Sequence, residues 1–210
     1  MKLKYFNVEQ GTEAWKIPKL GVISGSNIPK ALAKKGTETR SGYLMELVGQ
    51  IATKKFDEIN GKALEHGTIN EPAARAAYEF ETGHKVEQTG FIYCEERRIG
   101  VSPDGLIPSL NKGLEVKNPF TSKVHADFLC NDKVKSEYEL QVMFSLYVTG
   151  YETWDFCSFH SGFKSNMLKV KTFERDPKIF ERFDNELPVF LQDLDEALAK
   201  IGLKYGSQWL

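Results

Sequence analysis

The stretch between residues 91 and 117 constrains the fold of this 210-residue chain more than any other part. It is rich in Gly, Pro and Asn, which separate short apolar pieces with the character of β-strands. These pieces lie at residues 91–93, 99–101, 105–107 and 113–117, and further strands are expected at 153–160 and 168–173. Helical periodicity precedes and follows this region. The order predicts an α/β fold in which helices flank a mixed central sheet.

Helices are predicted where apolar residues recur with helical spacing and capping residues mark the ends. They comprise a short helix from Ser26 and helices over about 41–56, 70–82, 122–130 and 136–149. A long C-terminal helix begins at Asp176-Pro177 and ends at Gly202. It is expected to bend or break near Pro188, because proline lacks an N–H.

No internal repeat or long linker divides the chain, so residues 1–210 are expected to form a single domain. No stretch approaches the roughly 18 consecutive apolar residues of a membrane helix, and the opening residues lack the apolar part of a secretory signal. A cytoplasmic protein is therefore expected. Cys94, Cys130 and Cys157 are widely spaced, which argues against disulfides and structural zinc and favours buried, reduced thiols.

Charge is distributed unevenly, although the formal net charge is only −1. Residues 1–40 carry an excess of Lys and Arg, and residues 174–200 an excess of Asp and Glu. Such a chain can present a basic groove to a phosphate backbone. Two solvated surfaces of opposite sign are the simpler interpretation of the charge alone.

Two segments carry the candidate chemistry: Pro103-Asp104 and Glu115-Val116-Lys117. Side chains alternate along a strand, so Glu115 and Lys117 share one face while Val116 points into the core. If the segments pair as a hairpin, the Asp104 carboxylate arrives beside Glu115. Adjacent carboxylates repel each other and are stabilised by a hard cation. Mg²⁺ is favoured, because no sulfur or imidazole accompanies them.

A site of this composition suits hydrolysis of a phosphodiester, which needs an acidified water and neutralised phosphate oxygens. Lys117 can orient or deprotonate the water, or stabilise the transition state when charged. Pro-Asp, a gap and Glu-x-Lys make the PD-(D/E)xK pattern of metal-dependent nucleases. Alone the pattern is weak, since it also arises as a Glu–Lys ladder on the surface of a strand.

Further motifs run along nearly the whole chain. They are Glu9-Gln10-Gly11, Ala14-Trp15, residues 20–26, 102–106, 113–122 and 195–199, and Gln208-Trp209. On these motifs the chain resembles the phage lambda exonuclease family, the alkaline exonucleases with the YqaJ viral recombinase domain. The resemblance implies one lambda-exonuclease-like nuclease domain over residues 1–210, with a restriction-endonuclease-like PD-(D/E)xK core.

The resemblance also implies an activity and an assembly. The family implies Mg²⁺-dependent, processive 5′-to-3′ digestion of one strand of linear duplex DNA from an end. The remaining 3′ single strand serves a single-strand annealing protein in DNA recombination. A homotrimer ring, a pair of Mg²⁺ ions with Mn²⁺ as a substitute, and a phage or prophage setting in the bacterial cytoplasm are implied as well.

Site residues follow from the resemblance by motif. Asp104 and Glu115 are the expected metal carboxylates, Lys117 is the catalytic lysine, and Val116 supplies a backbone carbonyl as a further ligand. Glu71 matches an additional acidic residue of the family. The sequence alone favours a different role for Glu71, as a carboxylate that stabilises the N-terminus of a helix.

By the same resemblance, a pocket for the terminal 5′ phosphate is expected from Lys19, Ser26, Ser102 and Gln141. Ser26 is alternatively a helix cap, and Gln141 a solvent-facing amide. Lys19 stands where the family typically has Arg, and a lysine cannot form the bidentate pair of hydrogen bonds that arginine makes to phosphate. Leu64 is a candidate wedge between terminal base pairs, or equally a core leucine.

Two other functions stay open. The same core can serve an endonuclease acting on internal DNA sites, since such cores support many cutting modes. A non-catalytic DNA-binding subunit is the third interpretation, and the complete set of Asp104, Glu115 and Lys117 counts against it.

Overall fold

The structure is a computed structural model that describes residues 2–57 and 62–210, with side chains from residue 69 onward in the second range. In these ranges the strands form two four-stranded sheets. The first has the order β1-β3-β4-β2 and contains β1 (Leu3–Phe6), β2 (Ile23–Ser24), β3 (Phe91–Cys94) and β4 (Ile99–Val101). The second has the order β5-β6-β7-β8 and contains β5 (Gly105–Ile107), β6 (Lys112–Lys117), β7 (Thr153–Phe159) and β8 (Leu168–Glu174).

Both sheets are mixed: β2 runs parallel to β4 and β6 parallel to β7, whereas the other pairs are antiparallel. The predicted α/β class is confirmed. The strands divide between two sheets, however, instead of forming one central sheet. The division falls after β4, at Pro103-Asp104, because proline cannot donate to a continuing ladder.

The helices are α1 (Glu13–Lys16), α2 (Ile28–Ala31), α3 (Glu38–Thr53), α4 (Lys62–Thr82), α5 (Ser122–Asn131), α6 (Ser136–Thr149) and α7 (Pro177–Lys200). Neither α1 nor β1 was expected from the sequence. The predicted start of α4 is wrong, since Pro72 lies inside the helix, and α7 continues through Pro188 without a break. Both prolines are exposed, so water can reach the carbonyl that the missing N–H leaves unpaired. None of the described helices is long and apolar enough to cross a membrane.

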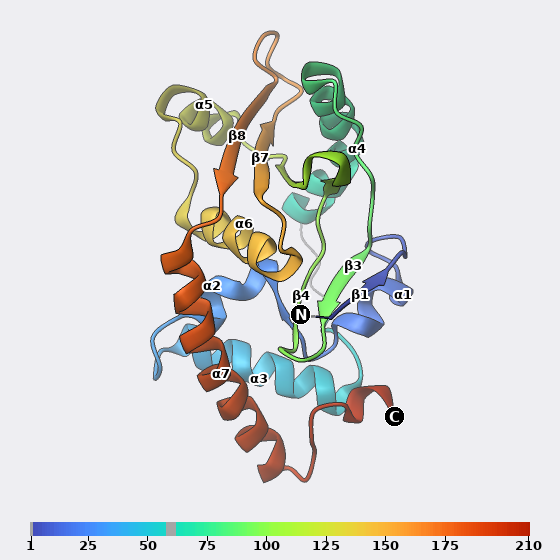
Figure 1. The fold of residues 1–210 in the computed structure, drawn as a ribbon, viewed down its shortest axis with the longest axis vertical. Helices are drawn as coiled ribbons and strands as arrows, with labels where there is room; N and C mark the ends of the chain where they lie inside the picture. The colour runs from blue at the N-terminus through green and yellow to red at the C-terminus, as the bar shows by residue number, and fades with distance from the viewer. Residues whose placement is uncertain (1, 58–61) are drawn as a thin grey trace.

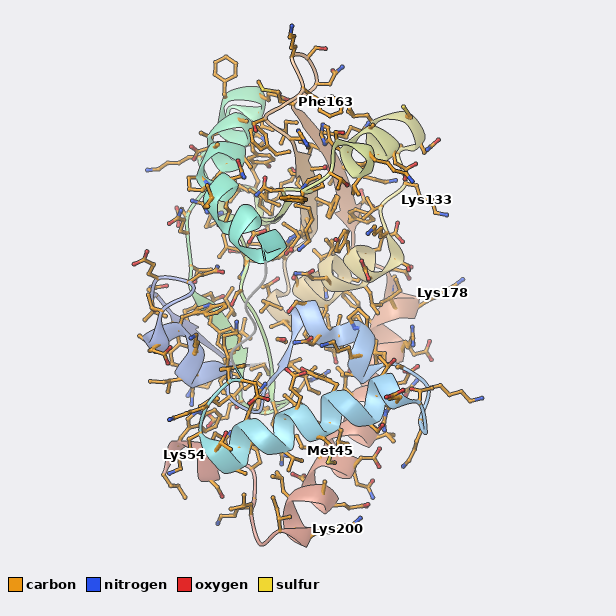
Figure 2. The ribbon with its side chains drawn as sticks, turned by 180° about the vertical axis from the view of Figure 1, so that it is seen from behind. Met45, Lys54, Lys133, Phe163, Lys178 and Lys200 are labelled. Atoms are coloured by element: carbon orange, nitrogen blue, oxygen red, sulfur yellow. The ribbon has the colours of Figure 1, made fainter. Side chains whose placement is uncertain are left out.

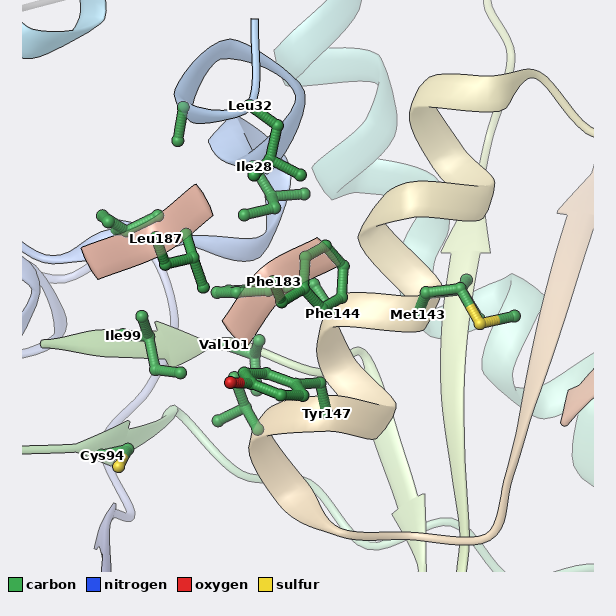
Figure 3. Close-up of a cluster of buried hydrophobic side chains, with 14 of the residues drawn as sticks. Ile28, Leu32, Cys94, Ile99, Val101, Met143, Phe144, Tyr147, Phe183 and Leu187 are labelled. Carbon is green, nitrogen blue, oxygen red and sulfur yellow. The ribbon is translucent and has the colours of Figure 1, made fainter. Parts of the chain in front are cut away.

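Helix α6 lies at the centre of the larger hydrophobic core. Its residues 142–148 are all buried, because the helix packs against strands of both sheets and against α2 and α7. Figure 3 shows Phe144 of α6 beside Phe183 of α7, and their rings meet edge to face at 5.4 Å between centroids. Burying one such side chain contributes roughly 1.5–3 kcal/mol. The core therefore fixes α6, and with it Gln141 at the start of the buried run.

Helix α4 lies beside the second sheet (Figure 1), and a smaller hydrophobic core joins the two. Val116 packs there with Ala74 and Tyr78 of α4. The buried Tyr78 hydroxyl donates a hydrogen bond of 2.7 Å to Asp155 of β7. Because both apolar and polar contacts tie α4 to the sheet, side chains on the same helix are placed firmly relative to β6. Two cysteines, in β3 and β7, are buried as expected, whereas Cys130 is exposed.

The charge separation along the sequence is partly cancelled in space. α7 packs against α3, and its Asp193 forms ion pairs with Lys35 at 2.8 Å and with Arg40 at 2.7 Å. The acidic C-terminal segment thus neutralises basic residues of the same chain. Lysines such as Lys133 and Lys178 project from the outside of the molecule (Figure 2).

Candidate active site

The hairpin of β5 and β6 places Asp104. The strands pair antiparallel with Gly105 opposite Leu114, as the sequence predicted. Asp104 lies one position further along, where its N–H donates to the carbonyl of Leu114 at 3.2 Å. Its Oδ2 accepts a hydrogen bond of 2.6 Å from the N–H of Val116. Backbone and carboxylate are therefore both held against β6.

Glu115 and Lys117 share the face of β6 that Asp104 approaches. Glu115 is only 3% exposed, and its Oε1 accepts hydrogen bonds from Lys117 Nζ at 2.5 Å and from Gln141 Nε2 at 2.7 Å. Val116 between them is buried on the opposite face, so the predicted alternation is confirmed. An exposed Glu–Lys ladder does not describe this arrangement, because the carboxylate is buried.

The site concentrates negative charge. Burial and the Glu115 carboxylate raise the pKa of Asp104 well above its usual range. Burial also raises the pKa of Glu71, against the opposing effect of Arg75. Burial by itself lowers the pKa of Lys117, but Glu115 and Asp104 outweigh it and raise that pKa above its ordinary value. The carboxylates therefore favour a positive group between them, and Lys117 is charged here.

The donors fit a hard cation. The acidic groups present oxygen ligands, and none of the described residues that line the cavity offers sulfur or imidazole. Among the described residues no group of three or more His, Cys, Asp or Glu could hold a metal ion by itself. Mg²⁺ commonly binds through one or two carboxylates and keeps several waters. The combination of Asp104, Glu115 and a nearby backbone carbonyl suits such a partly hydrated ion better than a closed protein cage.

Glu71 lies in the third turn of α4, so its interpretation as an N-terminal helix carboxylate is wrong. Its Oε1 accepts a hydrogen bond of 2.5 Å from Arg75 one turn later. Arg75 also donates from Nε to the carbonyl of Asp104 at 3.2 Å. Sequence reasoning missed Arg75, although its i,i+4 spacing from Glu71 was a usable signal. This arginine ties α4 to the hairpin.

Lys19 and Ser102, both expected at the 5′ phosphate, meet at Trp15. Lys19 Nζ lies 3.0 Å from the centroid of the indole ring, and burial lowers the pKa of Lys19 to about 7. Trp15 Nε1 donates to Ser102 Oγ at 3.0 Å. Trp15 itself is fixed at the start of α1, because the side chain of Thr12 caps the helix by accepting from the Trp15 N–H.

Ser26 and Gln141 complete the predicted set. Ser26 lies within a 3₁₀ turn, Gly25–Asn27, and does not cap α2, since the cap position is Asn27. Gln141 is not a solvent-facing amide, because it is half-buried and bound to Glu115. A Cβ at Gly25 would lie 3.7 Å from Gln141 Cγ, so the turn and α6 are in close contact.

One cavity, of about 1870 Å³, brings these side chains together. The predicted residues that line it are Lys19, Ser26, Glu71, Ser102, Asp104, Glu115, Val116, Lys117 and Gln141. The predicted wedge, Leu64, lies outside the described side chains. We call the part of the cavity lined by Glu71, Asp104 and Glu115 its acidic end, and the part lined by Trp15, Lys19 and Ser102 its second end.

The comparisons with known proteins agree with this fold. The solved structure of LHK-Exo in complex with dAMP superimposes with a TM-score of 0.83 and 30% identity, over 90% of this chain and 96% of that one. LHK-Exo is an alkaline exonuclease from Laribacter hongkongensis, and a second structure of it matches with a TM-score of 0.82. The fold and its neighbours define the class: a lambda-exonuclease-like nuclease with a restriction-endonuclease-like core.

The family follows from the sequence comparison. The YqaJ-like viral recombinase domain family matches residues 14–152, about two thirds of the chain. The chain belongs to this family, whose members are nucleases of recombination that act on DNA and generally use a divalent metal. An uncharacterized protein of Escherichia coli strain K12, ExoD, is 37% identical over 78 residues, covering 37% of this chain and 90% of ExoD. A phage-related exonuclease from Haemophilus somnus 129PT shares the fold, with a TM-score of 0.72 at 12% identity.

Proposed function

We propose that this protein is a Mg²⁺-dependent exonuclease that degrades one strand of linear duplex DNA in the 5′-to-3′ direction and leaves a 3′ overhang for recombination. One observation carries the proposal: Asp104, Glu115 and Lys117 share a cavity with Lys19 and Ser102. We interpret the first three residues as a hydrolytic centre and the last two as part of a cationic pocket for an end group, because both sets line the same space.

The residues divide the work at the acidic end. Asp104, Glu115 and the carbonyl of Val116 would hold Mg²⁺, with Glu71 contributing to a second ion, and Mn²⁺ suits the same oxygen donors. Such an ion acidifies the attacking water and neutralises charge on the phosphate oxygens. Lys117, held charged, donates hydrogen bonds to the water or to the scissile phosphate.

The supporting contacts keep these groups in place. The Val116 N–H orients the Asp104 carboxylate, and Gln141 orients that of Glu115. Fixed donors and acceptors of this kind need little reorganisation during the reaction, which favours catalysis. Positioning of the reacting groups is therefore built into β6 and α6.

At the other end, Lys19, Ser26, Ser102 and Gln141 would receive the terminal 5′ phosphate. Gln141 reaches both ends, since its amide donates to Glu115 while its helix contacts the turn containing Ser26. Leu64 would part the terminal base pair. On this proposal, the division would make hydrolysis start from a 5′ end.

Processivity is proposed to come from a ring-shaped homotrimer around the duplex, because a threaded duplex leaves only by sliding off an end. The resulting single strand would pass to an annealing protein in the bacterial cytoplasm, in a phage or prophage setting. Sedimentation that shows a monomer at working concentrations would remove this part of the proposal.

A strand-labelled digestion tests the activity. Linear duplexes labelled on either strand, with or without a 5′ phosphate, are incubated with Mg²⁺. Nucleotide release from the 5′-terminated strand supports the proposal, whereas release from the 3′ end contradicts it. Covalently closed circular DNA should stay intact, and its linearisation would favour an endonuclease. Protection of DNA without turnover in Mg²⁺ or Mn²⁺ would favour a non-catalytic binding subunit.

A further inference from the structure

Trp15 contacts both Lys19 and Ser102 at the second end of the cavity. Its ring face lies under the Lys19 ammonium at 3.0 Å, and its Nε1 donates to Ser102 Oγ at 3.0 Å. The same N–H also lies 2.9 Å from the carbonyl of Gly90, which fixes the plane of the ring. These contacts join segments 75 and 87 residues apart along the chain.

The hydrogen bond to Ser102 determines which way the hydroxyl can act. A serine hydroxyl has one proton to donate and two lone pairs. Trp15 occupies one lone pair with its N–H, so the Ser102 proton is left to donate elsewhere. Ser102 is half-buried and lines the cavity, and the hydroxyl is therefore prepared as a donor for an acceptor that enters it.

The ring contact prepares Lys19 in a similar way. In the part of the chain that the structure describes, the Lys19 ammonium has no carboxylate partner, and the indole face offsets part of its desolvation. An aromatic face attracts a cation without an oxygen acceptor on its N–H groups. These donors consequently remain available to an incoming anion, whereas the Lys117 ammonium already donates to Glu115.

We infer that Trp15 is the positioning residue that makes this end of the cavity selective for a DNA end carrying a 5′ phosphate, because it aligns Lys19 and Ser102 as donors to the same anion. The inference rests on the proposed function. Trp15 does not itself touch the phosphate, and it acts through the two side chains that do.

The test measures the rate at which the first nucleotide is released from duplexes with a 5′ phosphate and with a 5′ hydroxyl, and takes the ratio. Trp15→Phe keeps an aromatic face and removes the N–H, so the ratio should fall about three- to tenfold. Trp15→Leu removes both and should lower it further. Trp209→Phe is the matched control, because Trp209 Nε1 also donates to a backbone carbonyl, that of Ile17 at 3.0 Å.

A double-mutant cycle separates positioning from general damage to the fold. If Trp15 acts through Ser102, the variant carrying both Trp15→Phe and Ser102→Ala should have the ratio of Ser102→Ala alone, within about twofold. The inference would be overturned if the effects of the two substitutions on the ratio multiply in the double variant. It would also be overturned if Trp15→Phe leaves the ratio unchanged while Ser102→Ala lowers it. Either result would leave the proposed function standing. A ratio of one in the unaltered protein would remove both the phosphate pocket and this inference.

The same comparison can be made without cleavage. Binding of the two duplexes is measured in the presence of a chelator, so that loss of catalysis cannot obscure the result. The preference for the phosphorylated end should again fall in Trp15→Phe and persist in Trp209→Phe. An equal preference in all three proteins would contradict the role of Trp15.

Discussion

The two ends of the cavity each contain a half-buried lysine, and the surroundings shift the pKa of the two lysines in opposite directions. Lys117 faces the carboxylates of Glu115 and Asp104, which raise its pKa despite burial. Lys19 faces the ring of Trp15, and burial lowers its pKa to about 7. A full negative charge close by compensates for lost hydration, whereas an aromatic quadrupole compensates only in part. The comparison shows that the partner, more than the depth of burial, sets the charge of a lysine.

This difference suits two tasks. On the proposed function, a group beside the scissile bond has to keep its charge throughout the reaction, and the raised pKa of Lys117 favours this. A group that receives an end phosphate has to give up its ground-state contact easily, and a ring contact is released at a lower cost than an ion pair. The four predictions that follow test the contrast, beginning with the strongest expected effect.

Lys117→Met should reduce the rate of Mg²⁺-dependent nucleotide release by about 10²–10³-fold or more, because a fixed positive group is lost beside the reacting phosphate. Asp104→Ala should be equally inactive. Single-turnover digestion measures both. Lys178→Met, which removes an exposed lysine far from the cavity, is the control, and full activity in Lys117→Met would exclude the proposed site.

Lys19 should make the preference for a 5′ phosphate depend on pH. Its pKa of about 7 means that the charged, phosphate-binding form predominates below that pH and is lost above it. The preference should therefore decline as pH rises from about 7 to 9, by at most about tenfold per unit. Bound phosphate moves the decline upward by stabilising the ammonium. In Lys19→Arg the preference should stay flat, and a declining profile there would assign the titration to another group.

Gln141→Ala should weaken both ends together, since the amide donates to Glu115 and the Cγ of the same side chain lies close to the Gly25 turn. A loss of about tenfold in cleavage rate is expected, because Glu115 keeps Lys117 but loses its second donor. The preference for a 5′ phosphate should fall as well. Gln192→Ala removes an amide that donates to Glu196 on the exposed face of α7, and it should change neither quantity.

Tyr138→Leu should have the smallest effect. Its ring centroid lies 5.1 Å from Lys117 Nζ, so both lysines have an aromatic neighbour. Because the carboxylates already hold Lys117, the catalytic rate should change by less than about threefold. A much larger loss, in a variant with unchanged thermal unfolding, would show that the ring matters at both ends and would weaken the contrast.

Local patterns predicted a large part of this architecture. The strand pieces, the hairpin and the alternation of Glu115, Val116 and Lys117 follow from a period of two and from turn residues, which act over a few positions. The acidic end of the cavity could be assembled on that basis. Helix α6 could be predicted in the same way, because its apolar run is long and Gly150 ends it.

Other features depend on contacts that no short window contains. One such feature is the start of α4, which extends before Pro72 because this proline lies on the exposed side of the helix. The contacts of Trp15 with Ser102 and of Arg75 with Asp104 join residues that are 87 and 29 positions apart along the chain. Ser26 illustrates the opposite error, since the local signal for a cap was present and the chain formed a 3₁₀ turn instead.

If the protein has the proposed function, the contact of Gln141 with Glu115 affects how the enzyme moves along its DNA strand. Each hydrolysis leaves a new 5′ phosphate on the next nucleotide, which must advance to Lys19 before the following bond reaches Glu115. The distance between these side chains would then fix how far the strand advances after each hydrolysis. The identity of the base would not affect this distance. A DNA strand whose backbone is lengthened by one inserted linker unit would place the scissile phosphate away from Glu115. The enzyme should stall at that point.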